Sequence, residues 1–74
     1  MKVGDFVRVD GVYCRETDQF LHEGILLEGP RVVNNMGYIV HYLRILTPLG
    51  DVEMYLNDLD MIDGETLVVI NEEW

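Results

Sequence analysis

The chain has 74 residues, enough for one small domain whose core must use most of its apolar side chains. Its 14 acidic residues outnumber five basic ones, and the net charge of −9 argues against binding to phosphate backbones or anionic lipid surfaces. A single cysteine excludes an intrachain disulfide, and no apolar stretch resembles a signal peptide or reaches membrane-spanning length. These features predict a reducing, cytoplasmic compartment.

The first half of the chain is predicted to consist of short strands separated by turns. Alternating apolar residues predict a half-buried strand over Asp5–Val9. Asp10–Gly11 is a strong hairpin signal, and it begins a long connection, half hairpin and half loop, that ends at Leu21. A second, apolar strand is predicted over Gly24–Glu28, ended by Gly29–Pro30 because proline cannot donate to a ladder. Extended chain then leads to a turn at Asn34–Gly37.

The central hairpin is the strongest prediction. It has a long strand over Tyr38–Thr47, a turn over Thr47–Asp51 and a returning strand over Val52–Leu56. Pro48 supplies the fixed φ of a type I turn, and Gly50 supplies the positive φ that closes a three-residue hairpin with a bulge. This turn pairs Thr47 with Asp51, and that pairing determines which residues face the core.

One face of this hairpin is expected to form the core, and the other is too apolar for bare solvent. The core face comprises Tyr38, Val40, Tyr42, Leu46, Val52, Met54 and Leu56, with Arg44 as its only charge. The mixed face comprises Ile39, His41, Leu43, Ile45, Glu53, Tyr55 and Asn57.

A tight helical turn and a final strand are predicted after the hairpin. Asn57 caps a turn through Asp60 whose Leu59 drops inward. Asp63–Gly64 is another turn signal, and Thr66–Ile70 reads as a strand that is apolar on both sides.

Three segments carry a resemblance to a known family: VGDFVRV at the start, EGILLEG in the middle and YLNDLDMI near the end. Over Val3–Ile62 the order of elements resembles the SH3-like barrels, and more narrowly the small SH3-like proteins of uncertain role in tailed bacteriophages, marine ones among them. The resemblance implies an all-β, SH3-like barrel of five to six strands with one short helical turn. The length of the chain predicts a single domain over residues 1–74, and residues 64–74, which lie beyond the minimal barrel of the family, are expected to form an additional C-terminal strand and tail. The acidic-aromatic signature and paired tryptophans of proline-binding SH3 domains are absent, so that mode of peptide binding is not expected.

The sequence contains no recognisable catalytic, cofactor or metal motif. It has no serine, and Cys14 has no histidine at local spacing, so a nucleophile with a base is not indicated. His22 and His41 lack the spacing of known ligand pairs. Paired carboxylates at Asp58 and Asp60 are better explained as capping residues. We therefore expect no enzyme, no cofactor and no metal.

The expected function is a non-enzymatic interaction or assembly module that self-associates. The expected partners are a second copy of the chain and another protein, with no nucleic acid and no membrane; if the chain is phage-encoded, it would act inside the host cell. The alternatives are a nucleic-acid-associated barrel that stacks bases on its tyrosines, and an acidic inhibitor of a basic protein. The predicted partner-binding residues are Ile39, Leu43, Ile45, Tyr55, Leu67 and Val69.

Overall fold

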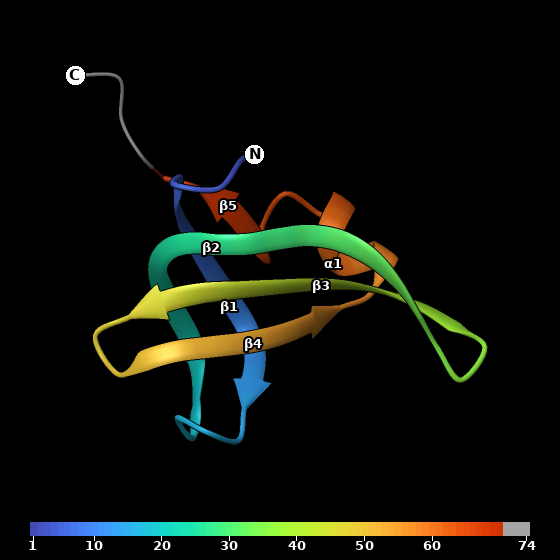
Figure 1. Cartoon of the computed structure of the whole chain (residues 1–74), viewed down its shortest axis with the longest axis horizontal. Coiled ribbons are helices and arrows are strands. Elements are labelled where there is room, and N and C mark those ends of the chain that lie inside the picture. Colours follow the sequence, from blue (N-terminus) through green and yellow to red (C-terminus); the bar gives the residue numbers. More distant parts are fainter. Residues whose placement is uncertain (71–74) are drawn as a thin grey trace.

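The computed structural model describes residues 1–70 and is all-β with one short helix (Figure 1). Its elements in chain order are β1 (Phe6–Cys14), β2 (Gln19–Asn35), β3 (Tyr38–Thr47), β4 (Gly50–Leu56), α1 (Asp58–Ile62) and β5 (Leu67–Val69). The tail at 71–74, predicted as polar chain ending in tryptophan, lies outside the described residues.

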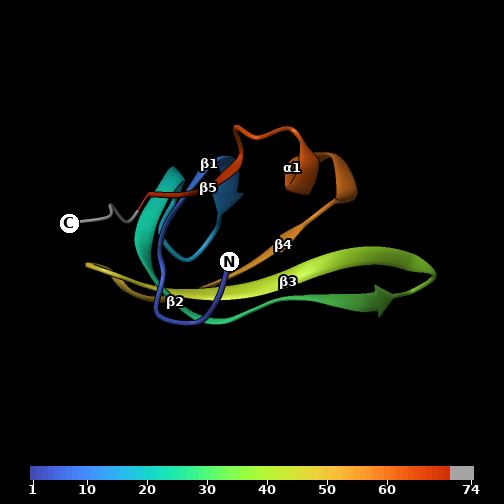
Figure 2. The same ribbon diagram turned by 90° about the horizontal axis from the view of Figure 1, so that it is seen from above.

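The five strands form one sheet in the order β4-β3-β2-β1-β5, and every neighbouring pair is antiparallel. The sheet folds over on itself. Figure 2 shows β1, β5 and α1 on one side of the layer that β3 and the second half of β2 form. The fully buried side chains fill the space between: Leu26, Leu43, Ile45, Met54, Leu56, Val7, Val9 and Val52.

The fold depends on the bend in the 17-residue strand β2. Its first half pairs with β1, its second half pairs with β3, and the register shifts on both sides of Glu28. Gly29 has φ +87°, and a Cβ there would lie 2.3 Å from the carbonyl oxygen of Tyr42. Gly29–Pro30 therefore bends one strand, where the sequence had predicted that it ends one. The ladder resumes immediately, with Arg31 opposite Tyr42.

The register of the β3–β4 hairpin differs from the prediction by one residue. Thr47 pairs with Gly50 rather than Asp51, so the turn contains only Pro48 and Leu49. The Thr47 hydroxyl accepts from the Leu49 amide at 3.1 Å and donates to the Gly50 carbonyl at 2.9 Å, which stabilises the tighter turn.

This shift changes which face of β3 lies inside, because side chains alternate along a strand. Leu43 and Ile45 are 0% exposed, so their assignment to the mixed face is wrong. Tyr38 and Leu46, predicted for the core, are exposed. The assignment of β4 is confirmed, with Val52, Met54 and Leu56 buried.

Two smaller predictions also differ from the structure. Asp10–Gly11 is not a hairpin turn: β1 continues to Cys14 with a register shift, and the chain reverses afterwards, where the Asp18 amide donates to the Cys14 carbonyl at 2.8 Å. The predicted Asn57 cap is confirmed and forms a capping box with Asp60. Leu59, however, is exposed rather than inward.

Candidate interaction surfaces

The six predicted partner-binding residues do not form one surface. Leu43, Ile45 and Leu67 belong to the chain's own hydrophobic core. Ile39 and Tyr55 are exposed, but they lie on opposite faces of the sheet: Ile39 shares a face with the buried Leu43 and Ile45, whereas Tyr55 is opposite Tyr42 on the other face. Val69 is exposed at the edge of the sheet. Contact of Ile39, Tyr55 or Val69 with a partner stays a prediction.

The most prominent surface feature is the far half of the β2–β3 hairpin, residues 31–41, which we call the arm. It projects beyond the rest of the fold (Figures 1 and 2). Its two-residue turn has Met36 at φ +52° and Gly37 at φ +86°, and the Asn34 side chain accepts from the Gly37 amide at 3.2 Å. The exposed large apolar side chains of the arm are Val32, Met36, Tyr38 and Ile39.

The arm lies within a stretch that carries no acidic residue. All 14 acids lie in residues 1–28 and 51–74, while residues 29–50 contain Arg31 and Arg44. Arg31 pairs with Glu28 at 3.1 Å and lies over the Tyr42 ring, 4.8 Å from its centroid. Arg44 lies 3.7 Å from Glu28. The two arginines are thus paired near the base of the arm, and the tip is neutral.

One face of the arm continues the core face of the sheet, and we call it the inner face. Val32 is opposite His41, and Ile39 is opposite Asn34; by alternation all four share a face with the buried residues of β3. The helix α1 covers this face only near its base, where His41 Nε2 lies 2.6 Å from Asp58 Oδ1. Figure 2 shows α1 on the side of the inner face, with the arm extending past it. On α1 itself, Leu59 and Ile62 are exposed.

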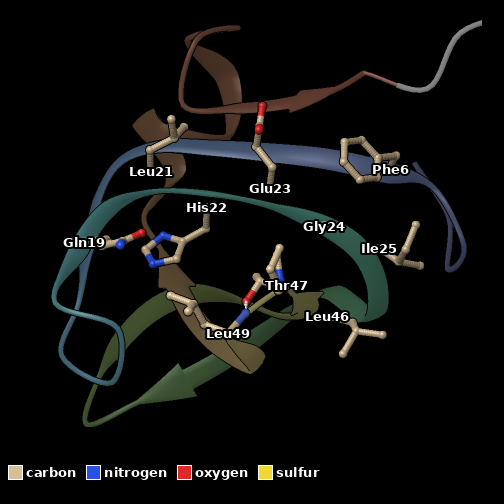
Figure 3. A pocket seen from close by; sticks show the side chains of 11 residues that line it. Phe6, Gln19, Leu21, His22, Glu23, Gly24, Ile25, Leu46, Thr47 and Leu49 are labelled. Atoms are coloured by element: carbon tan, nitrogen blue, oxygen red, sulfur yellow. Dashed lines mark hydrogen bonds between the residues drawn. The ribbon is translucent and has the colours of Figure 1, made fainter.

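A pocket of about 580 Å³ forms a second candidate surface, between β2 and the β3–β4 turn (Figure 3). Gly24 makes this arrangement possible, because a Cβ there would lie 1.9 Å from the Leu46 carbonyl oxygen and β2 could not approach β3 so closely. The lining residues are Phe6, Gln19, Leu21, His22, Glu23, Gly24, Ile25, Leu46, Thr47, Pro48 and Leu49.

His22 is a buried residue in the wall of this pocket. Its Nε2 lies 2.6 Å from the Thr17 hydroxyl, which in turn lies 3.4 Å from the Cys14 carbonyl oxygen. Burial lowers the pKa of His22 and keeps the ring neutral at pH 7. Its Nδ1 is buried and has no hydrogen-bond partner among residues 1–70.

Among residues 1–70, the one cysteine is buried and no metal cluster is present. Burial, and secondarily the charge of Glu16, raise the pKa of the Cys14 thiol, which favours the unreactive protonated form. No group of three or more histidine, cysteine or acidic side chains within residues 1–70 could hold a metal ion. Over the same residues, no helix is long and apolar enough to span a membrane.

Sequence reasoning identified neither surface as a unit, although it named Ile39 of the arm and one surface left a readable signal. The acid-free stretch at 29–50 is visible in the sequence and marks the hairpin that contains the arm. The pocket had no such signal, because it depends on a close approach between Gly24 and Leu46, which are far apart along the chain. Comparisons with protein-family models, with curated proteins and with solved structures found no match to this chain.

Proposed function

We propose that this chain is a non-enzymatic interaction module that self-associates through the inner face of its arm. The proposal includes kinship with the small SH3-like barrels of tailed phages and action in the cytoplasm of a host cell. The observation that supports self-association through the arm is that exposed apolar side chains and an absence of acidic residues occur together on one projecting hairpin.

Charge favours the arm as the place where two copies meet. Each chain carries a net charge of −9, so most surface pairings between two copies bring carboxylates together. The neutral tip of the arm avoids this repulsion. High salt screens the remaining repulsion between the two bodies, so association through the arm should tighten as salt rises.

Apolar exposure supplies the attractive part of the interaction. Val32 and Ile39 lie uncovered on the inner face, and Leu59 and Ile62 lie uncovered on the helix beside it. In a two-fold dimer the same patch on each chain must be complementary to itself. If the arm of each copy lies against α1 of the other copy, the same contact forms twice and the two-fold symmetry is satisfied.

Light scattering on the full chain at tens of micromolar tests the proposal, with variants matched for exposure. Val32→Asp places a charge on the inner face at 64% exposure, and Val3→Asp places the same charge off the arm at 62%. We expect a dimer for the parent and for Val3→Asp, and an increase of at least about tenfold in the dissociation constant for Val32→Asp.

A second variant separates folding from association. Met36 is 92% exposed at φ +52°, a conformation that aspartate tolerates, so Met36→Asp should melt like the parent and still weaken the dimer. A monomeric parent at tens of micromolar would overturn the proposal, as would a dimer that weakens when salt is raised.

A further inference from the structure

The open edge of β2 beside the pocket points to a binding site separate from the arm. Along one edge of β2, residues 21–25 pair with residues 6–10 of β1, with Leu21 opposite Asp10 and Ile25 opposite Phe6. On the other edge, β3 begins to pair only where Leu46 is opposite Ile25. Among residues 1–70, the segment 19–24 therefore has a strand neighbour on one side only.

The hydrogen bonds around β1 determine which backbone groups point out of this edge. The Asp10 amide donates to the Thr66 carbonyl, and the Ile70 amide donates to the Phe6 carbonyl, so these two β1 residues direct those groups towards β5. Backbone groups alternate along a strand, so Val7 and Val9 direct theirs towards β2.

Gly24 is opposite Val7 and His22 is opposite Val9, so the backbone N–H and C=O groups of Gly24 and His22 bond to β1. The Leu26 amide obeys the same alternation and donates to the Asp5 carbonyl at 2.8 Å. The backbone N–H and C=O groups of Leu21 and Glu23 therefore point away from β1, out of the open edge of β2. These two residues present two N–H and two C=O groups at the spacing that an added strand requires.

The pocket places apolar side chains beside these groups. Leu21, Ile25, Leu46 and Leu49 line it and are all exposed. Edge strands in natural proteins are commonly protected by lysine, proline or a covering loop. The segment 19–24 contains neither lysine nor proline, and its only charged side chain, Glu23, pairs with Arg8 at 2.9 Å.

Charge indicates what occupies the site. The lining carries the Glu23 carboxylate and no lysine or arginine. The outer strands of a second copy make poor occupants, because β4 carries Asp51 and Glu53 and β5 is preceded by Glu65. An occupant with its own lysine or arginine is attracted by the acidic body.

We propose that this edge and pocket bind a short extended segment of another protein, which adds to β2 as a strand with alternate apolar side chains and at least one lysine or arginine. The segment 19–24 is about 20 Å long at roughly 3.3 Å per residue, which suits an added strand of about six residues. Apolar side chains on one face of the added strand enter the pocket, and basic side chains on the other face lie towards the acidic surface.

The test uses the full chain and a designed capped peptide of sequence KVTVKV, followed by amide NMR shifts up to millimolar peptide. We expect the amides of Leu21 and Glu23 to shift with saturation, while those of Val32 and Ile39 on the arm do not. An acidic analogue, EVTVEV, should bind at least about tenfold more weakly. No saturable shift at Leu21 and Glu23 would overturn the proposal.

N-methylated peptides distinguish an added strand from simple charge attraction. One version carries methyl groups on every second amide, and the other carries them on the remaining amides. Only one set of amides faces β2, so one version should lose at least about tenfold in affinity and the other should bind like the parent peptide. Equal binding of the two versions would refute strand addition.

Matched protein variants test the contribution of the pocket. Leu49→Ser removes an apolar side chain that lines the pocket, and Leu59→Ser makes the same change on α1 as a control. The two leucines are 64% and 71% exposed, so neither substitution should affect folding. We expect weaker peptide binding for Leu49→Ser only. Equal affinities for the two variants would remove the pocket from the proposal. Because these readouts involve Leu21, Glu23 and Leu49, failure here is distinguishable from failure of self-association through the arm.

Discussion

Gly24→Ala should be among the most destabilising single-methyl changes in this chain. The new Cβ would lie 1.9 Å from the Leu46 carbonyl oxygen and 2.7 Å from its carbonyl carbon. An ordinary contact is roughly 3.5 Å, so β2 and β3 would have to separate by about 1.5 Å at this point. Both atoms belong to backbone, and no side-chain rotation can relieve the clash.

The cost of this separation can be worked out from its parts. Forcing extra volume into a packed site costs about 1–3 kcal/mol. Loss of one or two ladder hydrogen bonds near Ile25 and Leu46 adds about 0.5–1.5 kcal/mol each. The sum is about 1.5–6 kcal/mol, against a total stability of about 4–11 kcal/mol for a chain of this length.

Urea unfolding followed by far-ultraviolet circular dichroism measures this cost, with Gly37→Ala as the control. Gly37 has φ +86° and open space around it, so its substitution costs only the backbone strain of about 1–2 kcal/mol. Both variants lose the same glycine flexibility in the unfolded chain. If Gly24→Ala proved less destabilising than Gly37→Ala, the close approach of β2 and β3 would be refuted.

Three further predictions address the turn, the buried histidine and the charge. Gly50→Val should lower the melting temperature through more than about 1 kcal/mol of strain, because Gly50 has φ +109°; an unchanged melting temperature would contradict the turn geometry. Burial lowers the pKa of His22 in the folded chain, so below about pH 6.5 the unfolded chain binds a proton that the folded chain resists, and stability falls as pH falls. Urea midpoints between pH 7.5 and 5.5 should therefore drop less in His22→Asn than in the parent, and equal drops would count against the buried neutral ring. Fluorescence anisotropy at about 150 mM salt should detect no micromolar binding to single- or double-stranded oligonucleotides, because the net charge is −9 and the cations are scattered.

Local patterns predicted those parts of the fold that depend on near neighbours. Alternation identified the buried face of β4 and predicted that β1 is half-buried, and the Asn57 cap was readable from a residue type and its position. The register of β3 was not readable with the same certainty, because it depends on whether two or three residues close the turn. Side-chain bonds from Thr47 to Leu49 and Gly50 stabilise the shorter turn, and the turn signals of Pro48 and Gly50 do not reveal them.

Non-local contacts account for the remaining differences. Gly29–Pro30 is a sound signal for the end of a strand, yet here the ladder with β3 resumes beyond it and makes it a bend. Similarly, the pocket requires Gly24 to meet Leu46, a contact that no local pattern encodes. The mixed face of the hairpin predicted an exposed apolar surface, and the register error placed Leu43 and Ile45 on it together with Ile39, which does lie exposed on the arm.

The pairing of β5 with β1 has a mechanical consequence. The Ile70 amide bonds to the Phe6 carbonyl, so the last residue of this ladder lies beside the first residue of β1. A stretching force that pulls Phe6 and Ile70 apart acts across the ladder and breaks its hydrogen bonds one after another, starting from this pair. Among residues 1–70, three residue pairs, from Val7 with Val69 to Val9 with Leu67, and one flanking backbone hydrogen bond at each end hold β5 in register. The domain should therefore peel open from this edge under small forces, however stable its core is towards heat or denaturant.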